Sequence, residues 1–278
     1  MLNISFYITL LYKTALVRLR TGQLNLPAAG LLLILNLVLA LPTQANDKVI
    51  RFSVSAFPPF TIVKDKHVSG IDIDILQQLA KTIGHEILLI QCPWKRCLKL
   101  MEQGQIDMMA TALYTQERAQ YMEYIRPEYV RTAIAFYSAI KNKIQINQYD
   151  DLLSLTVGRE LGSANFEPFN SDIRIIKKDF MEQTQLLHLL MAERIDVVVG
   201  GRVSMNYMIE QNDYGNNIIQ QPYLHMGAKA YFTVSKKSKL MQFINPLTRE
   251  MQTLQDNGFL NTVIDKVSSG EDFNRQAF

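Results

Sequence analysis

The chain contains few of the residues that mark metal, redox or disulfide-rich proteins. Of its 278 residues, two are cysteine, one is tryptophan and four are histidine. Two cysteines alone make a poor zinc site, since a structural zinc ion usually takes four ligands. The histidines show no metal-ligand spacing and are His67, His85, His188 and His225. We therefore expect neither a metal site nor a cofactor.

An excess of one charge is also missing once the N-terminus is set aside. The formal net charge is +3, but residues 1–45 hold Lys13, Arg18 and Arg20 and no acidic residue. Without these three of the 29 basic residues, 26 remain, which equals the number of acidic residues. A balanced chain lacks the basic surface that nucleic acids attract. We therefore expect no nucleic-acid partner.

The apolar run near the N-terminus is short. Ala28–Leu41 has 14 residues, fewer than the ~20 that span a bilayer as a helix. Basic residues precede the run, and small residues follow it at Thr43 and Ala45. This pattern predicts a cleavable signal peptide over residues 1–45 and a free periplasmic protein, because no cysteine near the cleavage site offers a lipid anchor. An uncleaved membrane anchor is the alternative.

Cys92 and Cys97 enclose a four-residue segment between a predicted strand and a predicted helix. In the oxidising periplasm, a disulfide between them is the simplest interpretation. A redox role usually uses the shorter C-x-x-C spacing. A pair of reactive thiols remains the alternative. Trp94 and Arg96 lie inside this segment, near a strand end where they could contact a ligand, although burial of Trp94 beside the disulfide is the simpler interpretation.

Strand and helix patterns alternate along the first half of the chain. Alternating apolar residues predict a strand at 50–54, and a helix follows with Asp72 as its N-cap and Gly84 as its end. The next expected elements are a buried strand at 87–90, a helix from about Trp94 to Gly104 and a strand at 106–112. This β-α-β order predicts an α/β fold with a mostly parallel sheet and ligand sites at the carboxyl ends of the strands.

A second unit of the same kind begins near Lys141. We expect strands at 155–158, 173–176 and 195–199, a helix at 181–193, a return strand at 228–234 and terminal helices over 239–266.

Four motifs between Phe57 and Arg118 resemble those of a known family. They are Ala-Phe-Pro-Pro-Phe at 56–60, Gly-Ile-Asp-Ile-Asp at 70–74, Gly-Gln-Ile-Asp at 104–107 and Thr-Gln-Glu-Arg at 115–118. Their order is similar to the first lobe of periplasmic solute-binding proteins of family 3, which capture polar amino acids for ABC importers.

This resemblance implies a two-lobed periplasmic binding protein fold of type II. The two lobes have mostly parallel sheets and are joined by a two-crossing hinge near 137–143 and 227–233. Lobe 1 would comprise residues 46–140 and 229–278, and lobe 2 residues 141–228.

The resemblance also implies site residues in lobe 1. Phe57 stands where the family places an aromatic ring over the ligand, although a Phe beside a Pro-Pro turn is also a typical core residue. Arg118 stands where the family grips the ligand carboxylate, and a guanidinium suits this because its planar fork donates two parallel hydrogen bonds. A solvated helix residue is the alternative for Arg118. Thr111 and Leu113, just before it, are further candidates.

In lobe 2, Gly162 and Ser163 resemble a Gly-Thr motif that offers backbone N–H groups and a hydroxyl to the same carboxylate. We expect a helix to begin there, after the preceding strand, and the first N–H groups of a helix are unpaired and attract anions. Ser163 could equally be an ordinary cap. Gly201 stands where the family has an Asp that holds the ligand ammonium, and we expect Arg202 beside it to add positive charge to the site. The ammonium of the ligand is therefore expected to be absent or held by other groups.

We expect a non-enzymatic, monomeric protein that binds a small polar, carboxylate-bearing solute by hinge closure and delivers it to the membrane subunits of an ABC importer. A periplasmic dehydratase-like enzyme on the same fold is one alternative, although no cleft acid stands out in the sequence. A sensor subunit that presents its ligand to a membrane receptor is the other.

Overall fold

The computed structural model describes residues 48–65 and 67–268. The predicted signal peptide, residues 1–45, lies outside these ranges, so its cleavage stays a prediction. Within the described ranges, none of the helices has the length and apolar character needed to cross a membrane.

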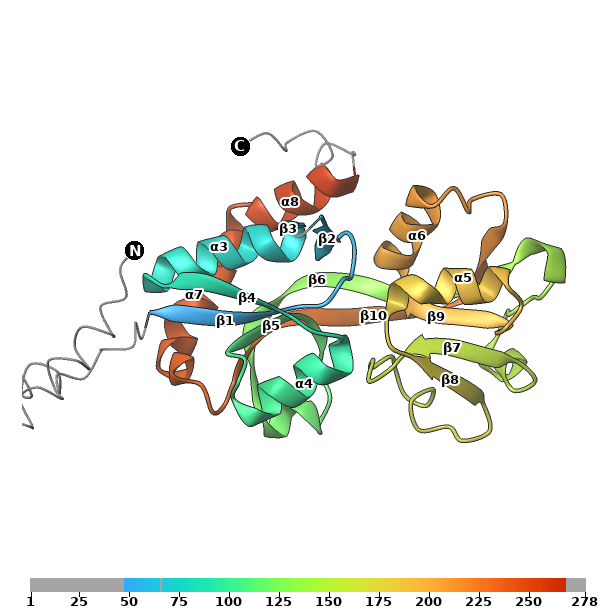
Figure 1. Cartoon of the computed structure of the whole chain (residues 1–278), viewed down its shortest axis with the longest axis horizontal. Coiled ribbons are helices and arrows are strands. Elements are labelled where there is room, and N and C mark those ends of the chain that lie inside the picture. The colour runs from blue at the N-terminus through green and yellow to red at the C-terminus, as the bar shows by residue number, and fades with distance from the viewer. Residues whose placement is uncertain (1–47, 66, 269–278) are drawn as a thin grey trace, which may run out of the picture. The chain divides into compact units, whose positions relative to one another are not determined.

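An eight-stranded sheet runs through both lobes in the order β4-β1-β5-β10-β6-β9-β7-β8 (Figure 1). Its strands are β1 (Val49–Val54), β4 (Glu86–Gln91), β5 (Met108–Leu113), β6 (Met122–Ala139), β7 (Thr156–Glu160), β8 (Ile176–Phe180), β9 (Val197–Gly201) and β10 (Ile218–Ser235). A small hairpin pairs β2 (Ile62–Lys64) with β3 (His67–Ser69). The strands of β4-β1-β5 and of β9-β7-β8 are parallel. The predicted α/β class with mostly parallel strands is therefore confirmed.

Two long antiparallel strands, β6 and β10, connect the two groups of parallel strands. They correspond to the two predicted crossings. The helices flank the sheet and are α3 (Ile71–Ile83), α4 (Trp94–Gln103), α5 (Leu186–Met191), α6 (Arg202–Gln211), α7 (Ile244–Asp256) and α8 (Phe259–Ser268). Short 3-10 turns are η1 (Arg118–Gln120), η2 (Ile140–Asn142), η3 (Tyr149–Leu152), η4 (Gln183–Gln185) and η5 (Lys239–Phe243).

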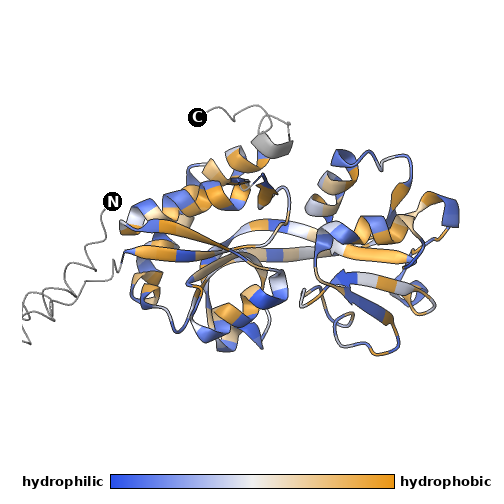
Figure 2. Ribbon diagram, in the orientation of Figure 1, coloured by the Kyte–Doolittle hydropathy of each residue, from blue (hydrophilic) through white to orange (hydrophobic). Residues whose placement is uncertain are grey.

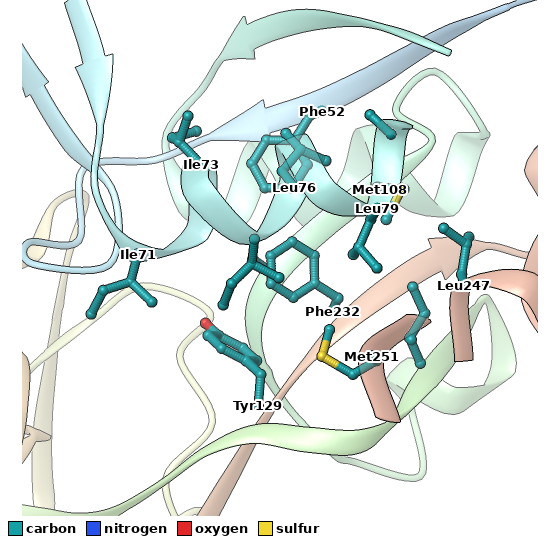
Figure 3. Packing of buried hydrophobic residues seen from close by; sticks show 14 of the residues in the cluster. Phe52, Ile71, Ile73, Leu76, Leu79, Met108, Tyr129, Phe232, Leu247 and Met251 are labelled. Carbon is teal, nitrogen blue, oxygen red and sulfur yellow. The ribbon is translucent and has the colours of Figure 1, made fainter. Parts of the chain in front are cut away.

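The first lobe is built around the apolar face of α3. Apolar and polar residues alternate along this helix in Figure 2, as expected for an amphipathic helix. Its buried face, which includes Leu76 and Leu79, packs with Phe52 of β1, Phe232 of β10 and Met251 of α7 (Figure 3). The terminal helices therefore return to the first lobe, as predicted.

Buried residues change from one hydrophobic cluster to another along both crossing strands. In β6 the change falls between Val130 and Ile134, and in β10 it falls between Ala228 and Ala230. This packing favours a first crossing several residues before the predicted lobe limit at residue 140. The lobe limits themselves stay predictions.

Several predicted elements have different limits or environments. Helix α3 begins at Ile71 after Gly70, so Asp72 is not its N-cap but a buried residue of its first turn. Strand β4 is an edge strand rather than a buried one, and Leu88 is 52% exposed. Strand β8 begins at Ile176, three residues after the start predicted at Ile173, and Ile173 is 95% exposed.

Two predicted helices of the second lobe also need correction. The helix expected at 181–193 is a 3-10 turn followed by the six-residue α5. No helix begins at Gly162–Ser163, because the described residues that follow β7 form turns and loop up to β8. A continuous helix dipole is therefore not available to a ligand at that point.

Candidate functional site

A pocket lies where strands from both lobes end. It is lined by residues at or near the carboxyl ends of β1, β5, β7 and β9, among them Ser53, Ala110, Glu160 and Val199. In parallel α/β sheets, ligands bind at this end of the strands. The position of the pocket agrees with the expectation drawn from the order of elements.

Phe57 extends from the first lobe toward the second. Its backbone pairs with Thr61 through two hydrogen bonds of 2.9 and 3.0 Å, which close the Pro-Pro turn. The Phe57 ring stacks on Phe60 at a centroid distance of 5.6 Å, and both residues line the pocket. A Cβ added to Gly201 would lie 3.7 Å from Cζ of Phe57. Phe57 is therefore a pocket residue rather than a fully buried core residue, whereas Phe60 is buried.

Arg118 is buried at the pocket, with 5% of its surface exposed. Its Nη1 donates to the Leu113 carbonyl oxygen at 3.0 Å, and its Nη2 donates to the Gly162 carbonyl oxygen at 2.9 Å. Each terminal nitrogen of an Arg carries a second hydrogen, so the fork retains donors for an acceptor in the pocket. Burial lowers the pKa of Arg118, but a guanidinium remains charged in proteins.

Trp94 supports the Arg118 guanidinium, whose Cζ lies 5.4 Å from the centre of the indole ring. The indole N–H also donates to the Gly162 carbonyl oxygen, at 3.2 Å. Trp94 lies between Cys92 and Cys97, which form the predicted disulfide. The half-buried Trp94 lines the pocket, whereas Arg96 is exposed and is not among the lining residues.

Thr111 is held in an unusual backbone conformation. Its φ angle is +53°, a left-handed value that is uncommon for a β-branched residue. Its hydroxyl donates to Asp72 at 2.7 Å, and the Tyr129 hydroxyl contacts both residues. Thr61 supplies a third hydroxyl to the same carboxylate. Burial raises the pKa of Asp72, and these three hydroxyls oppose the rise. The network fixes the floor of the pocket.

Glu160 places a second acidic side chain in the pocket, from the end of β7. It is 9% exposed, and burial raises its pKa to about 8. The backbone N–H of Gln183 opposes this rise by donating to the carboxylate, and Glu182 adds to it. Glu160 was not among the predicted site residues, because the predicted strand stopped at residue 158. A strand extended by two residues would have indicated it.

Six of the eight predicted ligand-binding residues line the pocket: Phe57, Thr111, Leu113, Arg118, Ser163 and Gly201. The carbonyl oxygen of Gly162 accepts bonds at the rim, although Gly162 is not a lining residue. Arg202 is exposed at the start of α6 and is also not among the lining residues. The expectation that Arg202 adds positive charge to the site is therefore not supported. Four further residues line the pocket although the sequence did not predict them as site residues: Asp72, Asn165, Gln183 and Ser204.

Two lobes joined by two long strands, with a pocket between their strand ends that holds a buried Arg and two buried acids, are typical of the solute-binding proteins. Residues 50–267 match the profile of the bacterial extracellular solute-binding proteins, family 3, and the chain belongs to this family.

Curated relatives are binding proteins. The chain is 24% identical over 215 residues to the Probable histidine-binding protein of Campylobacter jejuni, covering 76% of this chain and 80% of the relative. It is 22% identical to the arginine-binding extracellular protein ArtP of Bacillus subtilis, with coverage of 82% and 89%.

Solved structures show the same fold. A mutant of the arginine-binding protein ArgBP from T. maritima superimposes with a TM-score of 0.72 at 18% identity, covering 80% of this chain and 96% of that protein. An ancestral arginine-binding protein bound to arginine gives a TM-score of 0.69 at 20% identity, with coverage of 79% and 97%.

Proposed function

We propose that the chain binds a small polar solute with a carboxylate group in the periplasm and delivers it to the membrane subunits of an ABC importer. The observation that carries this proposal is the Arg118 guanidinium, which is buried at the pocket, stacked on Trp94 and provided with further N–H donors. A preorganised guanidinium in a desolvated pocket favours a carboxylate, because the two groups match in charge and in geometry.

The relatives support the amino-acid class of solute, since their names refer to histidine and arginine. These relatives are binding proteins, which supports a non-enzymatic role. In this proposal the protein is exported by the signal peptide of residues 1–45 and acts as a monomer. Its lobes, with limits near residues 140 and 228, close on the solute through β6 and β10.

A thermal-shift screen followed by calorimetry tests this proposal. The screen covers amino acids, simple carboxylic acids and polyamines. Each hit that has a carboxylate is then compared with its amide, in which the carboxylate is replaced by a neutral group. A specific ligand at a hundredfold excess over Kd stabilises the fold by about 2.7 kcal/mol. We expect carboxylates to shift the unfolding temperature and their amides to lose the shift. Equal binding of the acid and its amide would contradict the carboxylate clamp.

A further inference from the structure

Unpaired polar atoms are concentrated in one wall of the pocket. Among the described residues, four buried side-chain nitrogen or oxygen atoms have no hydrogen-bond partner. They are Ser163 Oγ, Asn165 Nδ2, Gln183 Oε1 and Ser204 Oγ. All four residues line the pocket, and all belong to the second lobe. Buried polar groups in folded proteins are nearly always paired, so this wall has the character of a site whose partners come from a ligand.

The two acidic groups of the pocket differ in how well they are satisfied. The Asp72 carboxylate accepts hydrogen bonds from three hydroxyl groups, so its role is to hold the pocket floor. The Glu160 carboxylate receives the backbone N–H of Gln183 and is almost as buried. Arg118, the cation of the pocket, donates to carbonyl oxygens of Leu113 and Gly162. Glu160 is therefore the acid that retains capacity to accept hydrogen bonds.

Gln183, whose backbone N–H donates to Glu160, adds a second acceptor to the pocket with its side chain. Its Nε2 lies 3.3 Å from the Met205 sulfur. A thioether sulfur can only accept a hydrogen bond, so the amide nitrogen belongs on that side and Oε1 is left without a donor. A Cβ added to Gly200 would lie 2.9 Å from Nε2, so the absence of a side chain at Gly200 gives the amide its space.

Building on the proposed function, we infer that the ligand also carries a protonated nitrogen, and that the Glu160 carboxylate and Gln183 Oε1 receive it. Both protein groups are acceptors, and an ammonium or guanidinium has only donors. Gly201, which has no side chain, cannot supply this acceptor. The pocket then binds a bipolar solute, with its carboxylate at Arg118 of the first lobe and its cation at the second lobe.

This assignment couples binding to proton release. In the free protein, burial raises the pKa of Glu160 to about 8, and the charged groups that act on it are Glu182, which raises the pKa further, and Arg118, which lowers it. A bound cation favours the ionised carboxylate, so Glu160 must lose its proton when the ligand binds near pH 7. The affinity for a cation should rise about tenfold per pH unit up to pH 8 and level off above it.

The test uses three probes on the full mature chain: L-arginine, agmatine and pentanoate. Arginine carries both charges, agmatine lacks the carboxylate, and pentanoate lacks the nitrogen. Calorimetry between pH 6 and 9, in buffers of different ionisation enthalpy, measures the affinity and the number of protons released. We expect close to one proton per bound arginine at pH 7 in the wild type, and a rise in affinity with pH for arginine and agmatine.

Variants separate a ligand anchor from a structural acid. Glu160→Gln should weaken arginine binding at pH 8.5 at least tenfold and abolish both proton release and the pH dependence. Gln183→Leu keeps the backbone N–H to Glu160, so it should weaken binding but keep the proton release. Glu182→Gln, an exposed neighbour, is the matched control: it should keep the binding and the proton release, with the pH dependence moved to slightly lower pH because Glu182 raises the pKa of Glu160. An unchanged pH profile in a folded Glu160→Gln variant would overturn the inference.

The same measurements are applied to the ligand that gives the largest thermal shift in the screen. A best ligand without a protonated nitrogen overturns this inference and leaves the carboxylate proposal standing. A best ligand with a cation but no carboxylate overturns the carboxylate proposal and leaves this inference standing. The absence of a thermal shift across the whole screen counts against both.

Discussion

Arg118 and Gly162 meet at the pocket although they are 44 positions apart: Nη2 of Arg118 donates to the Gly162 carbonyl oxygen at 2.9 Å. The indole N–H of Trp94 donates to the same oxygen. Two side chains of the first lobe thus use one carbonyl of the second lobe. This carbonyl and the Trp94 ring fix the orientation of the guanidinium, which prepares it for a planar acceptor.

Removal of the guanidinium should therefore weaken ligand binding. Hydrogen bonds to charged groups contribute about 1.5–3 kcal/mol each, and 1.4 kcal/mol corresponds to a tenfold change in Kd. We expect Arg118→Ala to weaken a carboxylate ligand at least tenfold in calorimetry. Arg202→Ala is the matched control, because this Arg is exposed outside the pocket lining, and its Kd should stay within twofold of wild type. Wild-type affinity in a folded Arg118→Ala variant would disprove the clamp.

Ligand binding should change the intrinsic fluorescence of the protein. Trp94 is the single tryptophan of the chain, and it lines the pocket beneath Arg118. A ligand that approaches the guanidinium changes the polarity around the indole ring. Titration with a ligand from the screen should shift the emission maximum or intensity in a saturable way. Trp94→Phe should abolish the signal while the protein still binds in calorimetry. A constant emission at saturation would place the ligand away from Trp94.

Reduction of the Cys92–Cys97 disulfide should lower stability moderately. The bond closes a loop with a sequence separation of 5, and loop-closure entropy for so short a loop amounts to about 2 kcal/mol. Urea unfolding with and without reductant measures the difference in free energy. The Cys92→Ala/Cys97→Ala double variant is the control, since its unfolding curve should not respond to reductant. An identical response of wild type and double variant would contradict a stabilising role.

The Arg51–Asp107 pair should be important for the first lobe. The Asp107 carboxylate accepts two side-chain bonds from Arg51 at 2.8 Å and one from Ser238 at 2.6 Å. It thereby joins β1, the start of β5 and the end of β10. Asp107→Ala should cost about 2–3 kcal/mol in urea unfolding, because it leaves these donors unpaired.

The control for this prediction is Glu102→Gln, which breaks the exposed Lys99–Glu102 pair. Surface pairs of this kind contribute about 0–1 kcal/mol. Equal losses of free energy in Asp107→Ala and Glu102→Gln would contradict the assigned role of Asp107.

Glu160 should make the protein less stable as the pH rises. Its pKa is about 8 in the fold against 4.5 for an ordinary Glu, so folding takes up a proton between these pH values. Stability then falls by at most about 1.4 kcal/mol per pH unit from this group. Burial raises the pKa of Asp72 too, so the comparison must isolate Glu160. In urea unfolding, the free energy of unfolding of the Glu160→Gln variant minus that of the wild type should increase from pH 5 to pH 8. A constant difference would show that Glu160 is ionised in the fold.

The sequence determined the fold class and part of the pocket through local signals. The apolar face of α3 and the stop at Gly84, the cysteine spacing and the strand-helix alternation are all encoded over short distances. Phe57 and Arg118 were placed by motifs that resemble a family, and both line the pocket.

Tertiary structure decided which polar groups share the pocket. Glu160, Gln183 and Ser204 come from three different elements, and their meeting depends on the packing of β7, η4 and α6. Local patterns also mistook the loop at Gly162 for a helix start, because Gly-Ser after a strand is equally typical of both. Burial and the pKa of Glu160 depend on neighbours distant in sequence, since desolvation is a property of the whole environment.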